Sequence, residues 1–335
     1  MLKIRNLLIL PLLLGTLSCG GKQSQASSDN ATDSIAPQPL SEMTFDADSA
    51  YSYVATQVKM GPRIPGTVGH DKCQAYIVGE LKRHGADSII QQRTTMEIHT
   101  GQIYAINNIL GRFNKDASKR VLLVAHYDTR PWADNDGTFS NREKPVPGAN
   151  DGASGVGVLL EIARQFSIKR PDVGVDMLFT DAEDSGQSSS WGAATDTWGL
   201  GAQYWCRHMP YQGKQLPVYG ILLDMVGARG AKFHREYFSE IYAPQVVDKV
   251  WSIADRSGYG DRFPNMRSGA VTDDHYFINQ AGIPTIDIIE CDNPVTKNFH
   301  PSWHTINDDM SVIDRATLKA VGQTVTNTIY TEPGK

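Results

Sequence analysis

Four short groups of acidic residues and histidines follow one another along this chain, each after an apolar run or in a loop beside one. These groups are His126-Tyr127-Asp128, Asn150-Asp151-Gly152, Glu183-Asp184 and Trp303-His304. Carboxylates and imidazoles are ligands that a borderline cation such as zinc takes in proteins. A bound zinc ion with an open coordination position polarises a carbonyl group toward attack. The four groups therefore predict one metal site and metal-assisted chemistry on a carbonyl carbon.

The apolar runs before these groups predict buried strands that carry them to one edge of a sheet. Strands are expected over residues 120–126, 173–180 and 218–223, and the polar residues that end or follow them are His126, Glu183, Asp184 and Asp224. In open α/β sheets, ligands bind outside the carboxyl ends of the strands. We therefore expect the metal ligands to meet at this edge.

The rest of the chain alternates between strand and helix patterns. Further strands are expected over residues 89–98, 104–113 and 284–289, and helices over 46–60, 70–84, 154–166, 201–208, 244–257, 273–281 and 310–330. This alternation predicts an α/β fold, an α/β/α sandwich whose central sheet is mixed and mostly parallel. The 335 residues contain no internal repeat, which suits one large catalytic domain.

Composition and charge narrow the class of protein. Hydrophobic residues make up 40% of the chain and charged residues 21%, which is typical of a soluble globular protein. The formal net charge is −5, and Lys and Arg are scattered, which argues against nucleic-acid binding. Beyond Cys19, three cysteines leave room for one disulfide, and none has zinc-finger spacing: Cys73, Cys206 and Cys291.

The N-terminus has the features of an export signal. Two basic residues precede a short apolar run, and Cys19, before two glycines, resembles the lipid-attachment cysteine of bacterial lipoproteins. A simple secretion signal and an uncleaved anchor are the alternatives. Residues 1–19 are therefore predicted to be a lipoprotein-type signal peptide, 20–42 a disordered tether and 43–335 the catalytic domain. We expect an exported, periplasmic protein anchored to an envelope membrane through Cys19.

The motifs in this order resemble those of the zinc aminopeptidase family M28, and more closely its cyclase branch, the animal-type glutaminyl-peptide cyclotransferases. Besides the four groups above, the matching pieces are Gly148-Ala149, Leu223-Asp224-Met225 and Thr272-Asp273-Asp274-His275. They span almost all of the expected domain in the order of the family. The resemblance thus implies a zinc exopeptidase-like fold.

The resemblance also implies the metal ligands and the proton-transfer group. It assigns zinc ligation to Asp151, Asp184 and His304, and general acid/base catalysis to Glu183. One position departs from the family, whose usual Glu-Glu pair is Glu183-Asp184 here. The shorter carboxylate of Asp184 requires the metal to lie closer to its loop.

The remaining implied site residues surround the substrate. Asp273 resembles a carboxylate that forms a hydrogen-bonded pair with Asp224, and both are assigned to catalysis. Trp191 and Trp303 resemble the aromatic walls of the cyclase pocket, and His126 is placed in the same pocket.

The implied activity is that of a glutaminyl-peptide cyclotransferase using one zinc ion. Its substrates would be peptides and proteins with N-terminal Gln, converted to pyroglutamate with release of ammonia. In the peptidases of the family, His126 and Asp224 would complete a second metal site, so a two-zinc aminopeptidase is the alternative. A third hypothesis is an inactive, peptide-binding surface lipoprotein, against which the complete set of carboxylates and histidines argues.

Several of these residues also have plain structural interpretations. Asp151 and Asp273 could each cap the helix that follows, and Asp128 is expected to orient His126 rather than to bind metal. Six further histidines are expected at the surface: His70, His84, His99, His208, His234 and His300. Four tryptophans are expected in the core or at interfaces: Trp132, Trp198, Trp205 and Trp251.

Overall fold

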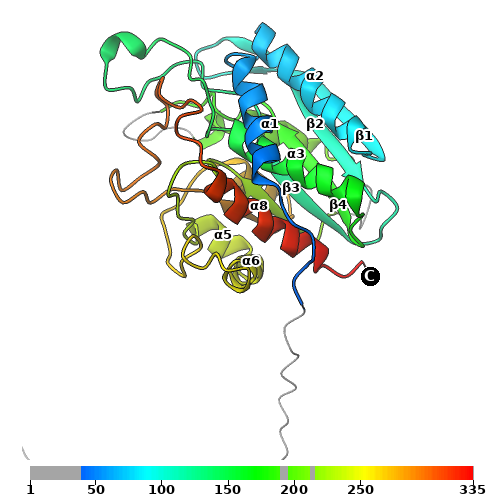
Figure 1. Cartoon of the computed structure of the whole chain (residues 1–335). Coiled ribbons are helices and arrows are strands. Elements are labelled where there is room, and N and C mark those ends of the chain that lie inside the picture. Colours follow the sequence, from blue (N-terminus) through cyan, green and yellow to red (C-terminus); the bar gives the residue numbers. More distant parts are fainter. Residues whose placement is uncertain (1–38, 189–194, 212–215, 335) are drawn as a thin grey trace, which may run out of the picture. The chain divides into compact units, whose positions relative to one another are not determined.

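A computed structural model of the chain describes residues 39–188, 195–211 and 216–334, and six of its strands form one sheet (Figure 1). The strands are β1 (Ser88–Glu97), β2 (Ile103–Phe113), β3 (Arg120–His126), β4 (Gly174–Thr180), β5 (Tyr219–Leu223) and β6 (Thr285–Ile288). Their order in the sheet is β1-β2-β4-β3-β5-β6. The pairs β1–β2 and β2–β4 are antiparallel, and the other three pairs are parallel. The predicted mixed, mostly parallel sheet is confirmed.

Helices connect and cover these strands. The α-helices are α1 (Ala47–Lys59), α2 (Val68–Arg83), α3 (Ala153–Ile168), α4 (Leu200–Arg207), α5 (Tyr237–Tyr242), α6 (Pro244–Arg256), α7 (Asp274–Gln280) and α8 (Arg315–Tyr330). Two short 3-10 helices are η1 (Phe139–Asn141) and η2 (Thr195–Thr197). The short helix α5 was not predicted. Helix α8 begins later than predicted because the Asp314 carboxylate accepts the N–H of Thr317 and caps it there.

Strand β3 shows why the sheet carries a helical layer on each face. Successive side chains of a strand point to opposite faces, so its residues divide between two hydrophobic clusters. Val121, Leu123 and Ala125 join the larger cluster with residues of α1, α2, α3, α6 and α8. Leu122 and Val124 join the cluster with Trp205 of α4 and Ile278 of α7. Figure 1 shows α1, α3 and α8 side by side over one face, which completes the predicted α/β/α sandwich.

The parallel strands bring their carboxyl ends to one edge. In the register of the sheet, His126 at the end of β3 pairs with Thr180 at the end of β4. Strand β5 lies on the other side of β3 and ends directly before Asp224. The segments that follow these strands therefore start next to one another, at the edge where ligands are expected.

The predicted signal peptide and most of the predicted tether are not covered by the structure. Residues 1–19 and most of the segment 20–42 lie outside the described residues. Within the described part of the chain, no helix has the length and apolar character needed to cross a bilayer.

The three cysteines of the domain are free thiols in this structure, with Cys73 buried and Cys206 and Cys291 partly buried.

Candidate active site

The three predicted metal ligands come together at the carboxyl edge of the sheet. Candidate ligand atoms of Asp151, Asp184 and His304 lie within 4.8 Å of one another, and all three residues are buried. The Nε2 atom of His304 lies 3.0 Å from Oδ1 of Asp184 and 3.8 Å from Oδ2 of Asp151. Neither carboxylate oxygen of Asp184 has a hydrogen-bond partner among the described residues. A buried, unsatisfied carboxylate beside an imidazole needs a cation, and this donor set fits zinc.

A second group of ligands shares Asp151 with the first. The Nε2 atom of His126 lies 3.1 Å from Oδ1 of Asp151 and 3.2 Å from Oδ1 of Asp224. The two oxygens of Asp151 thus face different groups, since its Oδ2 faces His304. Burial alone would lower the pKa of His126, but hydrogen bonds to Asp128, Asp151 and Asp224 outweigh it and raise the pKa well above its usual value.

The local backbone holds these ligands closely. A Cβ atom on Gly152 would lie 2.5 Å from Nε2 of His126, so only glycine permits this approach. Five non-glycine residues of the described chain have a positive φ, and three of them are at the site: Ala182 (49°), Met225 (48°) and His304 (56°). Such residues are uncommon and persist where the surrounding structure holds them.

Glu183 lines the same pocket as the Asp151-Asp184-His304 group. The Asp128 carboxylate accepts the backbone N–H groups of Glu183 (3.0 Å) and Asp184 (3.2 Å), which fixes the turn after β4. Asp128 also lies 3.4 Å from Nδ1 of His126, in agreement with its expected orienting role. Burial, and then the charge of Asp273, raise the pKa of Glu183 well above its usual value. A carboxyl group of raised pKa holds a proton more firmly than an ordinary glutamate, which suits a group that must return a proton.

Asp224 and Asp273 line the same pocket as Glu183. Burial, as the largest cause, raises the pKa of Asp224 to about 8. Asp273 caps α7 through its Oδ1 atom, as one interpretation of the sequence had it. Its Oδ2 atom has no hydrogen-bond partner among the described residues. One carboxylate oxygen of Asp273 lies within 4.8 Å of side-chain atoms of His275 and Asp287. Asp151, in contrast, does not cap α3, whose N-cap is Gly152 without a side-chain bond.

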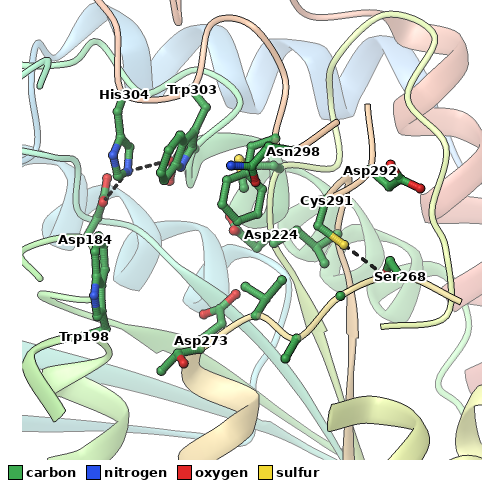
Figure 2. Close-up of a pocket in the computed structure, with 18 of the residues that line it drawn as sticks. Asp184, Trp198, Asp224, Ser268, Asp273, Cys291, Asp292, Asn298, Trp303 and His304 are labelled. Carbon is green, nitrogen blue, oxygen red and sulfur yellow. Dashed lines mark hydrogen bonds and ion pairs between the residues drawn. The ribbon is translucent and has the colours of Figure 1, made fainter. Parts of the chain in front are cut away.

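Tryptophans form part of the pocket, which has a volume of about 600 Å³. The ring of Trp303 stacks on His304 with centroids 3.7 Å apart, and Trp198 stacks on the same imidazole at 6.1 Å. Figure 2 shows both rings beside the Asp184–His304 pair, with Asp273 across the pocket. Trp198 had been expected in the core or at an interface, which was wrong. Trp191 lies outside the described residues.

Three histidines expected at the surface are buried: His70, His84 and His234. The Nε2 atom of His70 lies 2.9 Å from Oδ1 of Asp181, and the Tyr127 hydroxyl donates to the other oxygen of the same carboxylate at 2.7 Å. This polar network supports the segment that follows β3. The prediction failed because the partner Asp181 lies 111 positions away in the sequence.

Two carboxylates that support the ligands were not predicted. Asp308 accepts the backbone N–H groups of Asn150 (3.0 Å) and Asp151 (3.1 Å). Asp134 lies 3.5 Å from Nδ1 of His304 and so faces the ring atom opposite the metal group. Both residues lie in polar loops whose conformation is not encoded by any periodic pattern. Only their contacts in the folded chain reveal their positions.

Comparison with known proteins places this geometry in a family. The model of peptidase family M28 matches residues 108–329, and this chain belongs to that family. Glutaminyl cyclase of Tannerella forsythia is 48% identical, with 87% of this chain and all of that chain covered and a TM-score of 0.83. Glutaminyl cyclase of Bacteroides thetaiotaomicron, solved with N-acetylhistamine, is 46% identical, with 88% and 100% covered and a TM-score of 0.84. Bovine glutaminyl-peptide cyclotransferase is 24% identical over 76% of this chain and 74% of its own.

Proposed function

We propose that this protein is a zinc-dependent glutaminyl-peptide cyclotransferase. It converts the N-terminal Gln of peptides and proteins to pyroglutamate and releases ammonia. The observation that carries the proposal is the union, in one pocket, of the Asp151-Asp184-His304 group, the buried acid Glu183 and the stacked Trp303. The similarity to bacterial glutaminyl cyclases over almost all of the described chain supports the same activity.

Asp151, Asp184 and His304 would hold one zinc ion. When bound, zinc polarises the γ-carbonyl of the substrate Gln and stabilises the negative charge that develops on its oxygen. The three side chains are buried, so no reorganisation of solvent is needed to place their charges. Asp308 and Asp128 hold the ligand loops in place through backbone N–H groups.

Glu183 would transfer the proton. The substrate's own α-amino nitrogen forms a bond to the side-chain carbonyl carbon of Gln, and the bond from that carbon to the amide nitrogen breaks. Glu183 takes a proton from the attacking amine and gives it to the departing nitrogen, which leaves as ammonia. The raised pKa of Glu183 favours the return of the proton.

Asp224 and Asp273 would orient the α-amino group. Both carboxyl groups line the pocket with Glu183, and Oδ2 of Asp273 is free of hydrogen bonds from the described residues. The flat faces of Trp303 and Trp198 give the aliphatic part of Gln an apolar surface and exclude water, which would otherwise compete with the amine.

A two-zinc aminopeptidase is the second candidate, favoured by one observation. His126, Asp151 and Asp224 form a complete second ligand group with buried side chains. In that reaction, Glu183 would deprotonate a water molecule instead of the substrate amine.

One incubation separates the two reactions. The purified, zinc-loaded protein is mixed with a Gln-Phe peptide, and the products are identified by mass spectrometry. The cyclase yields the intact peptide less ammonia, and Glu183→Gln forms this product far more slowly. Free Gln and a shortened peptide would establish the aminopeptidase instead.

The cellular location is part of the proposal. Cys19 would carry a lipid that anchors the protein to an envelope membrane, so that the catalytic domain meets exported substrates in the periplasm. Mass spectrometry of the mature N-terminus tests this. A lipid-modified Cys19 supports it, and an unmodified N-terminus beyond residue 19 contradicts it.

A further inference from the structure

The side chain of Arg130 lies behind the Asp184–His304 pair and is fully buried, with an exposed fraction of 0%. It does not line the pocket, so it does not touch a substrate there. We propose that Arg130, together with Asp134, is the positioning unit that holds the metal ligands Asp184 and His304 and the aromatic wall Trp198 in their catalytic arrangement. The inference rests on the proposed function, because it takes Asp184 and His304 to be metal ligands.

All five N–H donors of Arg130 have acceptors around the site. Nε and one N–H of Nη2 form a bidentate pair with Asp134, at 2.8 and 2.7 Å. The other Nη2 donor reaches the hydroxyl of Ser188 at 2.9 Å. Nη1 donates to the backbone carbonyls of Asp184 (3.1 Å) and Gly186 (3.2 Å). The guanidinium thus fixes the backbone of the loop that carries Asp184. A lysine ammonium could not bind all of these acceptors with the same geometry.

Asp134 connects Arg130 to the ligand His304. Its two carboxylate oxygens accept the Nε and Nη2 donors of Arg130. The carboxylate held in this way faces Nδ1 of His304 at 3.5 Å. A carboxylate at this nitrogen fixes the tautomer and ring orientation in which Nε2 is free to bind metal. Nε2 indeed points toward Asp184 and Asp151.

Arg130 also supports the aromatic wall. Its guanidinium carbon lies 5.0 Å from the ring centroid of Trp198 and 5.1 Å from that of Trp132. Trp198 in turn stacks on His304 with an interplanar angle of 14°. A Cβ atom on Gly186 would overlap the Trp198 ring, so the loop and the ring pack in contact. One cation therefore joins the ligand loop, the ligand imidazole and the pocket wall.

The test compares Arg130, which follows β3, with Arg120, a second buried arginine at the start of that strand. Arg120, at the start of β3, forms a similar fork on Asp176 and donates to the carbonyls of Asn114 and Phe113, far from the ligands in the register of β3. Arg130→Lys, Asp134→Asn and the control Arg120→Lys are made in the whole protein. Zinc affinity is measured by competition with a chromophoric chelator, the absorption spectrum is recorded after replacement with cobalt, and kcat and KM are determined.

We expect Arg130→Lys to weaken zinc binding by about 10- to 100-fold and to alter the cobalt spectrum. Asp134→Asn, which keeps one acceptor, should do the same to a smaller extent. At saturating zinc, kcat should still fall for both variants. Arg120→Lys should lower the melting temperature and leave zinc affinity and spectrum unchanged.

Two results would overturn the proposal. One is a zinc affinity and cobalt spectrum of Arg130→Lys equal to those of the parent. The other is an equal loss of zinc affinity in Arg120→Lys, which would mean a general effect of stability. If Arg130→Lys does not fold, the zinc affinity and cobalt spectrum of Asp134→Asn test the proposal instead. The Asp134 side chain is 27% exposed, so this substitution is easier for the fold to tolerate. If the parent protein binds zinc and releases free Gln, the proposed cyclase activity is wrong. The zinc affinity of the Arg130 variant would still test whether Arg130 positions the ligands.

Discussion

Two buried carboxylates, one at each end of strand β4, differ in their hydrogen bonding. At the start, Asp176 is buried, and each of its oxygens accepts from two donors among Arg112, Arg120 and Tyr211. Beyond the other end, Asp184 is equally buried, and neither oxygen has a hydrogen-bond partner among the described residues. Both arrangements use the same kinds of residue. The difference is that both oxygens of Asp176 are fully hydrogen-bonded, whereas the Asp184 carboxylate accepts no hydrogen bond from these residues although Arg130 lies 3.5 Å from its Oδ1.

This contrast separates stability from function. A buried carboxylate surrounded by donors joins strands and needs nothing more. A buried carboxylate without donors costs free energy unless a ligand supplies the missing charge. The carboxyl edge also gathers the residues with positive φ, at Ala182, Met225 and His304. We infer that the Asp176 network at the start of β4 stabilises the fold, and that the packing around the carboxyl edge keeps its carboxylates available for a cation.

Removal of the metal should have the largest effect. Dialysis against a chelator should abolish cyclisation, because the carbonyl then lacks its electrophilic partner, and added zinc should restore it. The melting temperature should fall in parallel, since the carboxylates are left unpaired. Product formation and calorimetry check this. Full activity in protein shown to be free of metal would contradict the assignment of the carboxyl edge.

Glu183→Gln should have the second largest effect on activity. The amide cannot transfer the proton, so kcat should fall by about 10²–10⁴-fold. Zinc affinity should stay near that of the parent, because Glu183 is not one of the three ligands. The measurement is a peptide assay with a zinc titration of the same sample. A variant that turns over at the parental rate would exclude Glu183 as the acid/base group.

Asp176→Asn tests the start of β4. Breaking a buried ion pair by removing one partner typically costs about 3–5 kcal/mol in the free energy of unfolding. Because this network lies away from the ligands, kcat and zinc affinity of the folded fraction should not change. Denaturant unfolding and the peptide assay give the two values. A loss of zinc binding here would erase the distinction between the two ends.

Trp303→Ala should have a smaller effect on the substrate side. Loss of an aromatic contact is worth about 0.5–1.5 kcal/mol, so KM should rise by roughly tenfold or less. The kcat value should change little if the ring only receives the Gln side chain. Steady-state kinetics with the same peptide measure both. A fall in kcat alone would mean instead that the ring acts through the stacked His304.

The smallest expected effect is a difference in the pH dependence of stability between the metal-free and the zinc-bound protein. In the metal-free protein, the pKa of Asp224 is raised from 3.8 to about 8, so the folded state binds more protons than the unfolded state between these values. Stability should therefore decrease as the pH rises through this range. Zinc binds the ionised carboxylates, so the stabilisation by zinc should grow over the same range. Melting curves with and without zinc that stay parallel would contradict this.

The sequence by itself determined the elements and the residue types of the site. The apolar runs before His126 and Asp224 and the alternating pattern fixed the strands, their mixed sheet and the edge at which the ligands meet. This worked because burial of whole strands and the carboxyl-end rule are local and topological. The six-residue helix α5 escaped prediction because it is too short to show a period.

Only the tertiary structure decided which polar residues support the ligands. Asp134, Asp308 and Trp198 lie in loops, and the burial of His70 depends on a partner distant in the sequence. Arg120 begins β3 and Arg130 follows its end, and their identical charge does not reveal their different partners. Their roles differ because hydrogen bonding and burial depend on neighbours brought together by folding, which no periodic pattern records.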